Sequence, residues 1–191
     1  MKQHVSSVCK SASYALYSIG KLRPYLDQPS AEKLVHTFVS SRLDSCNSLL
    51  YGLPANELNR LQRVQNAAAR MITGVKGRVH MTPVLRKLHW LPIHKQIIFK
   101  ILLLTFKAIN GLAPGYIANL LAIKSPSKKL RSTSNGSLLL TPPSSKAIRT
   151  ATYGQRAFSS VAPSLWNRLP ASIRATKSVD RFKSLLKTYL F

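Results

Sequence analysis

The sequence predicts a mainly α-helical protein, and three observations lead to that prediction. Apolar residues recur at the spacing of one helix face in most of the long segments. Proline and glycine stand where those segments begin and end. A stretch at about 124–154 shifts to Ser, Thr, Pro, Lys and Arg. We therefore expect a three-helix unit over residues 1–76 and a second helical unit over 77–191, the latter containing this basic Ser/Pro-rich loop.

The first unit begins with two predicted apolar helices. Residues 3–22 carry apolar side chains at helical spacing, and Pro24 closes the segment. Ser30 is the expected N-cap of the next helix, with Glu32 in the first turn, and we expect that helix to run to Tyr51. Its predicted apolar arc consists of Leu34, Val35, Phe38, Val39, Cys46, Leu49 and Leu50.

Arg42 falls near the middle of this arc, where a lone cation needs an explanation. A structural role would be a snorkelling stem or a guanidinium bonded to backbone carbonyls. The alternative is direct contact with nucleic acid. We favour the structural role.

The third predicted helix carries a row of arginines. Pro54 suits its first turn and Gly74 its C-terminal cap. One side is apolar, through Leu58, Leu61, Val64, Ala68, Met71 and Ile72. The opposite side carries Arg60, Arg63 and Arg70. Because Lys76 and Arg78 follow and no acid balances them, we expect this side to contact phosphate.

The second unit is predicted to form around its most apolar helix. We expect that helix to start at Pro92 and to end before Gly111, with Lys100 and Lys107 leaving a narrow polar stripe. Further helical segments are expected at 82–90, 114–122, 156–174 and 178–191. Within the basic stretch we expect at most a short β-hairpin, from the segments LLLTPP and AIRTATYG.

The charge balance indicates a polyanionic partner. The chain has 29 basic and 5 acidic residues, a net charge of +24, and no acid at all between Leu58 and Val179. Such a charge distribution repels its own copies and attracts polyanions, with nucleic acid the first candidate. RNA or an RNA–DNA duplex is therefore the expected partner.

The same inventory argues against several classes of enzyme. Two-metal polymerase or nuclease chemistry needs clustered carboxylates, and the acids here are isolated: Asp27, Glu32, Asp44, Glu57 and Asp180. Neither GxGxxG nor GxxxxGK[ST] occurs, and the histidines and two cysteines lack zinc-ligand spacing. We therefore expect no catalytic activity, no cofactor, no metal and no small-molecule substrate.

Targeting signals are not predicted. The first residues lack the apolar core of a signal peptide, and the run Ile97–Ile109 is interrupted by lysines and is too short to cross a bilayer. Cys9 and Cys46 are far apart, so no disulfide framework is predicted. We expect an intracellular protein, nuclear or cytoplasmic, with no membrane partner. The aromatic residues Trp90, Tyr153 and Trp166 could stack on bases, but their apolar neighbours favour core packing.

Long segments of the chain also resemble a known family. SRLDSCNSLLYGLP, LNRLQRVQNAAARMITG and MTPVLRKLHWLPIHKQIIFKILLLTFKAINGLAP are similar to the region that follows the polymerase core of reverse transcriptases from non-LTR retrotransposons, LINE elements of the jockey and related types. The resemblance extends from about His4 to Phe191. It implies that residues 4–74 form the helical thumb, which grips the template–primer duplex, and that the remainder forms the C-terminal segment, which engages RNA or the target site.

By position, the resemblance implies that the arginine helix and the residues after it contact the duplex. The candidates for nucleic-acid binding are Arg60, Arg63, Arg70, Lys76 and Arg78, and Lys128, Lys129 and Arg131 in the later basic loop. The catalytic palm and endonuclease of the family are not found in this sequence, so we expect a non-catalytic fragment of a truncated element. A polymerase core acting in trans is a further expected partner. The alternative is an inert helical fragment or interaction piece whose apolar faces, in residues 3–22 and Leu34–Leu50, packed on a missing palm.

Overall fold

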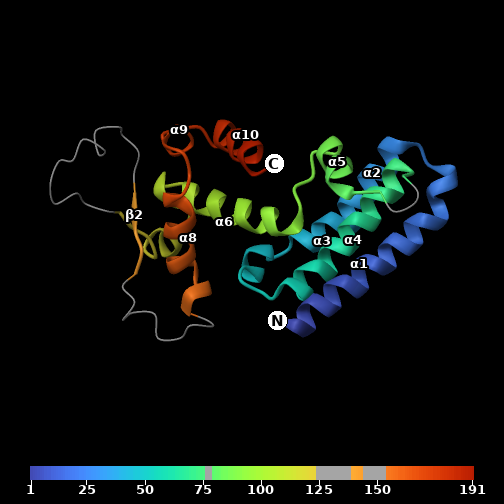
Figure 1. The fold of residues 1–191 in the computed structure, drawn as a ribbon, viewed down its shortest axis with the longest axis horizontal. Coiled ribbons are helices and arrows are strands. Elements are labelled where there is room, and N and C mark those ends of the chain that lie inside the picture. Colours follow the sequence, from blue (N-terminus) through green and yellow to red (C-terminus); the bar gives the residue numbers. More distant parts are fainter. Residues whose placement is uncertain (76–78, 124–138, 144–153) are drawn as a thin grey trace. The chain divides into compact units, whose positions relative to one another are not determined.

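The computed structural model describes residues 1–75, 79–123, 139–143 and 154–191, and these residues are mainly helical, as predicted (Figure 1). By compactness they divide into Met1–Ile97 and Ile98–Phe191, here called unit 1 and unit 2. This division falls within helix α6 (Ile93–Ile109), later than the boundary at 76–77 that the sequence suggested. Each unit is described by itself below.

Unit 1 is organised around two long helices, α1 (Lys2–Leu22) and α4 (Ala55–Thr73). They run in the same direction: Ser6 contacts Arg60 near their beginnings, and a Cβ on Gly20 would lie 3.6 Å from the Met71 side chain near their ends. The apolar side predicted for α4 is confirmed, since Leu61, Val64, Ala68 and Ile72 are buried. The predicted cap is confirmed as well, because Gly74 ends α4 in the left-handed conformation, with φ 68°.

The next segment differs from the single helix expected between Ser30 and Tyr51. Helix α2 (Gln28–Val35) starts three residues earlier than expected, because Asp27, not Ser30, is the N-cap and its side chain accepts a hydrogen bond from the Ser30 N–H. This hydrogen bond lowers the pKa of Asp27. A π-helical turn, η2 (His36–Ser40), and a short α3 (Ser41–Asp44) follow α2.

The expectation that the helix continues to Tyr51 is wrong. Cys46 adopts the left-handed conformation, with φ 53°, and is followed by a 3-10 turn, η3 (Asn47–Leu50). Short polar side chains at this break compete with helical hydrogen bonds, and the Asn47 side chain donates to Asp44 Oδ1. The π turn contains an extra residue, which changes the angle between successive side chains. Residues within and after the turn therefore need not lie where a helical wheel of about 100° per residue places them. Phe38 and Leu49, placed in the apolar arc by that wheel, are 46% and 63% exposed.

Unit 1 is completed by α5 (Met81–Lys87) and the first turn of α6. Helix α5 ends before the expected Leu91-Pro92 break, because His89 takes the left-handed conformation and the Trp90 N–H bonds to the Leu85 carbonyl. Two glutamines of α4 hold the connection to α6. The buried Gln65 donates to the Leu91 carbonyl at 2.9 Å, and Gln62 accepts from the Ile93 N–H at 2.9 Å.

Unit 2 contains most of α6, which is the most apolar helix, as expected. The other helical elements among the described residues of this unit are α7 (Gly115–Ala118), η5 (Gly154–Arg156), α8 (Phe158–Asn167), α9 (Ala171–Arg174) and α10 (Val179–Leu190). Its core is aromatic: Phe106 and Phe182 stack with ring centroids 4.2 Å apart, and Trp166 lies 5.9 Å from Phe182. Trp166 is 1% exposed, so the prediction that it packs in the core is confirmed.

A short antiparallel pair joins β1 (Ala122–Ile123) to β2 (Leu140–Thr141). Strand β2 lies in the predicted LLLTPP segment, and its partner β1 comes from just before the basic stretch. All of AIRTATYG except Gly154 lies outside the described residues. The Asn167 side chain fixes β2 to α8 by donating to the Leu140 carbonyl at 2.8 Å and accepting from its N–H at 3.0 Å.

Candidate nucleic-acid interface

The candidate interface is the side of α4 opposite its buried face. Arg60, Arg63 and Arg70 all lie on this helix, as the sequence predicted, but their surroundings differ. Arg63 is exposed, whereas Arg60 and Arg70 are half-buried. The three positions therefore cannot be treated as equivalent phosphate contacts.

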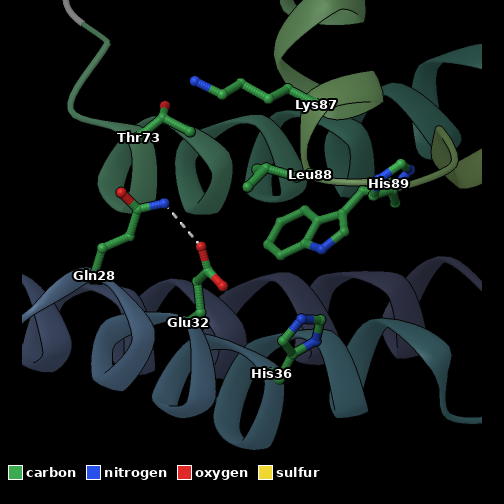
Figure 2. A pocket seen from close by; sticks show the side chains of 8 residues that line it. Gln28, Glu32, His36, Thr73, Lys87, Leu88 and His89 are labelled. Carbon is green, nitrogen blue, oxygen red and sulfur yellow. Dashed lines mark hydrogen bonds between the residues drawn. The ribbon is translucent and has the colours of Figure 1, made fainter.

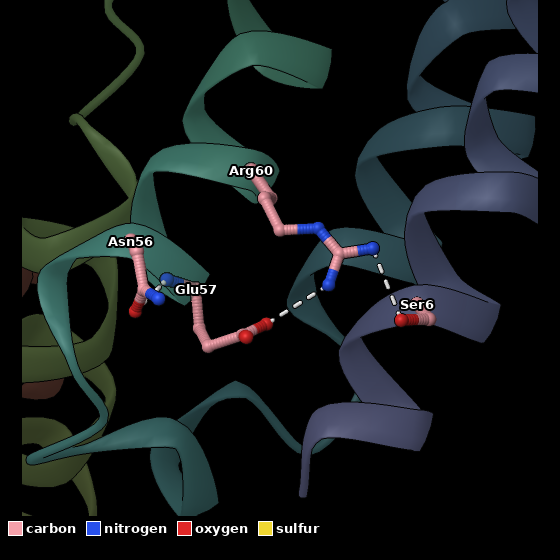
Figure 3. A network of polar contacts seen from close by, with 4 residues as sticks. All are labelled: Ser6, Asn56, Glu57 and Arg60. Carbon is pink, nitrogen blue, oxygen red and sulfur yellow. Dashed lines mark hydrogen bonds and ion pairs between the residues drawn. The ribbon is translucent and has the colours of Figure 1, made fainter.

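Arg60 ties α4 to α1 (Figure 3). Its Nη1 lies 3.0 Å from Glu57 Oε2, and its Nη2 donates to Ser6 Oγ at 3.0 Å. Glu57 is only 6% exposed, so its carboxylate depends on this guanidinium for charge compensation. Arg60 thus has a structural role, and part of its donor capacity is already engaged.

Arg63 is the most accessible of the three arginines. Within the described residues it has no hydrogen-bond or ion-pair partner. Its charge still acts inside the unit. Burial raises the pKa of the Cys9 thiol on α1, while the positive charges of Arg60 and Arg63 partly oppose that rise. Arg63 therefore lies close enough to α1 for its charge to act on that helix, and its donors remain available to a ligand.

Arg70 lies two helical turns beyond Arg63. Its Nε is enclosed by protein and, among the described residues, has no hydrogen-bond acceptor. An enclosed donor of a charged group that lacks an acceptor carries a desolvation cost, which an anionic ligand near the guanidinium would offset. Arg63 and Arg70 are therefore the stronger candidates on this helix.

A groove of about 600 Å³ runs beside α4 within unit 1. Its polar lining includes Asn59, Gln62, Asn66, His80 and His94, and its apolar lining includes Leu58, Val79, Met81, Leu85, Pro92 and Ile93. No carboxylate is among the lining residues. Partial burial, and then the neighbouring Lys95, lower the pKa of His94, which favours its neutral form. The groove thus offers amide and imidazole groups without repelling an anion.

A second pocket of unit 1, of about 280 Å³, has a different character (Figure 2). It lies between α2 and the end of α5 and contains the carboxylate of Glu32, which accepts from the Gln28 side chain at 2.9 Å. Trp90 lines it and meets the His36 ring edge-on at 5.4 Å. Trp90 also packs on the cluster of Ala69, Met81 and Leu85, which supports packing over base stacking. The carboxylate makes this pocket a poorer phosphate site than the groove beside α4.

Two arginines outside α4 turn out to be structural. Arg42 donates to the Ser11 carbonyl at 2.7 Å, which confirms the structural role favoured from the sequence. Arg23, which the sequence analysis did not single out, donates to the carbonyls of Met71, Ile72 and Leu26 at 3.1, 3.4 and 2.8 Å. Arg23 thus satisfies carbonyls at the end of α4. The position of Arg23, just after a long helix and just before Pro24, was the sequence signal that could have indicated this structural role.

The other candidate residues cannot be placed. Lys76, Arg78, Lys128, Lys129, Arg131 and Tyr153 lie outside the described residues. In the ranges that the structure describes, no group of three or more His, Cys, Asp or Glu side chains is arranged to hold a metal ion. Nor does any helix in those ranges combine the length and apolar character needed to cross a membrane.

Comparison of the chain with protein-family profiles, with curated proteins and with solved structures gives no match.

Proposed function

We propose that this chain binds RNA or an RNA–DNA template–primer duplex through phosphate contacts made by α4, as a non-catalytic C-terminal part of a LINE-type RNA-directed DNA polymerase. One observation carries the proposal. Arg63 is exposed and without a partner in the described residues, and Arg70 has an enclosed Nε without an acceptor, on a helix that begins a long acid-free segment. The likeness of the sequence to the thumb of such polymerases supports the choice of ligand.

The spacing of the two arginines suits a nucleic-acid backbone. Seven residues along an α-helix correspond to about 10 Å. Because arginine side chains are long, residues this far apart can reach two different phosphates of one ligand. Contacts of this kind position a duplex without reading its sequence, because phosphates are the same at every step. The expected binding is therefore salt-dependent and largely independent of sequence.

The test is a salt series of binding to an RNA–DNA hybrid. The wild-type protein should show a linear fall of log affinity with log salt, because bound phosphates release counterions. The double variant Arg63→Gln/Arg70→Gln should bind more weakly, with a slope shallower by about 2, one for each lost phosphate contact.

The matched control removes the same charge elsewhere. Lys177 and Arg181 are exposed residues of unit 2, and Lys177→Gln/Arg181→Gln should leave the slope near that of the wild type. Equal losses in the two double variants would show that overall charge, not α4, determines binding. Absence of salt-dependent binding by the folded wild-type protein would contradict the proposal altogether.

A second candidate function rests on a different observation. Leu22 and Phe38 are 52% and 46% exposed, and they line an apolar groove of about 270 Å³ between α1 and α2–η2. A surface of this kind suits an interaction piece that packs on a polymerase core supplied in trans. Under this alternative the folded protein binds a hydrophobic dye, Leu22→Gln/Phe38→Gln abolishes the dye signal, and no nucleic acid is bound. Dye binding that survives the double variant would exclude the groove as the docking surface.

A further inference from the structure

The outward face of α1 combines lysines and tyrosines in one row. Lys10, Tyr14, Tyr17 and Lys21 follow one another at intervals of four, three and four residues, the spacing of a single helix face. All four are exposed, Tyr14 by 72% and Tyr17 by 63%. The opposite face of α1 is the buried one, formed by Val5, Ala12, Ala15, Leu16 and Ile19. The row is therefore not part of the core of unit 1.

The segment that carries this row is basic. Residues 1–26 contain no acid, and Asp27 is the first acid of the chain. Within the row, the Lys21 ammonium lies 4.5 Å from the centroid of the Tyr17 ring, so one face of that ring is already used by a cation. From the neighbouring α4, Arg60 bonds to Ser6 but is paired with Glu57, and the charges of Arg60, Glu57 and Arg63 all reach Cys9. A ligand on α1 therefore meets positive charge on the row itself and, through Arg63, from the neighbouring helix.

We propose that the Lys10–Tyr14–Tyr17–Lys21 face of α1 binds single-stranded nucleic acid, with unpaired bases stacked on the tyrosines and phosphates held by the lysines. This site rests on the proposed function and extends it. Where a duplex is held at α4, the α1 face binds the unpaired strand that continues beyond the duplex. Charge complementarity favours this ligand over a protein surface, since an apolar partner would have to desolvate both lysines. Exposed aromatic side chains alternating with cations are what sequence-tolerant single-strand binding requires.

The test compares two ligands and three variants of the full chain. Binding is measured by fluorescence anisotropy, with a labelled oligothymidylate of about 12 nucleotides as the single strand and a blunt RNA–DNA hybrid as the duplex. In Tyr14→Leu/Tyr17→Leu, the Kd for the single strand should rise at least about tenfold, because stacking on the aromatic rings is lost. Its salt slope should not change, because no charge is removed, and the Kd for the duplex should stay at the wild-type value.

Two controls isolate the rings. Tyr14→Phe/Tyr17→Phe keeps the aromatic faces and should bind the single strand like the wild type. Tyr116 and Tyr189 are exposed tyrosines of unit 2, by 71% and 50%, and Tyr116→Leu/Tyr189→Leu should also bind like the wild type. Unchanged unfolding midpoints confirm that each variant is folded, which the exposure of these side chains leads us to expect.

The outcomes separate this inference from the proposed function. Single-strand binding that is indifferent to Tyr14 and Tyr17, while duplex binding still depends on Arg63 and Arg70, overturns the α1 site alone. The α1 site is also overturned if Tyr116→Leu/Tyr189→Leu weakens single-strand binding as much as Tyr14→Leu/Tyr17→Leu does. It is overturned as well if Tyr14→Leu/Tyr17→Leu weakens duplex and single-strand binding equally. If the wild-type protein binds neither ligand, the proposed function fails and the α1 site fails with it.

Discussion

The arginines of unit 1 fall into two classes with different roles. Arg23 and Arg42 donate to main-chain carbonyls at 2.7–3.4 Å, and these bonds hold helices together. On the outward side of α4, Arg63 is exposed with no partner among the described residues. The net charge of +24 therefore overstates the cations that a ligand can use, because several are already bonded within the protein. Arg60 lies between the two classes, since it is half-buried and ion-paired.

Replacing Arg60 should have the largest effect on stability. Arg60→Gln leaves the nearly buried Glu57 carboxylate without its cation, and we expect the free energy of unfolding to fall by about 2–3 kcal/mol. Urea unfolding measures this change. The double variant Glu57→Gln/Arg60→Gln should recover part of the loss, because it also removes the uncompensated charge. A loss in Arg60→Gln below about 0.5 kcal/mol would mean that the pair behaves like an ordinary surface ion pair.

Arg23→Gln should have the next largest effect. It removes hydrogen bonds to three carbonyls, two of which belong to the end of α4, and we expect a loss of about 1–2 kcal/mol in urea unfolding. Arg63→Gln is the matched comparison and should change stability by less than about 0.5 kcal/mol. The distinction between structural and available arginines would be wrong if both variants lost the same stability.

The Cys9 thiol offers a smaller but local readout of Arg63. Because the Arg63 charge opposes the rise that burial causes in the pKa of Cys9, Arg63→Gln should raise that pKa further. The alkylation rate of Cys9 should then reach its half-maximum at a higher pH. The measurement is made in a Cys46→Ser background, since Cys46 is exposed and would react first. An unchanged pH profile would show that Arg63 points away from α1.

Much of this architecture follows from local sequence signals, and the exceptions have identifiable causes. The limits of α4 agree with Pro54 and Gly74 because proline and glycine constrain the backbone directly. The helix expected up to Tyr51 was wrong because a π turn and a left-handed Cys46 arise from packing and local competition that a periodic pattern does not contain. Hydrophobic periodicity assumes a fixed angle per residue, so an irregular turn can rotate later side chains off the predicted face, as it does for Leu49, although Leu50 remains buried.

The arginines show the same limit at the candidate site. A helical wheel placed Arg60, Arg63 and Arg70 on one side, and this much the structure confirms. The i,i+3 spacing of Glu57 and Arg60 was a sequence signal for their ion pair, whereas the contact of Arg23 with carbonyls of α4 joins different helices and has no such spacing signal. To tell which cations are bonded within the protein and which remain available to a ligand, the contacts in the three-dimensional structure are needed.

The central claim, that Arg63 faces a ligand while Arg23 and Arg42 serve the fold, can be tested most directly by arginine-selective chemical modification. The folded protein is treated with a dicarbonyl reagent with and without an RNA–DNA hybrid, and modified sites are identified by mass spectrometry. We expect Arg63 to react in the free protein and to be protected by the hybrid, while Arg23 and Arg42 react slowly in both samples. Equal modification of Arg63 with and without a bound hybrid would contradict this account.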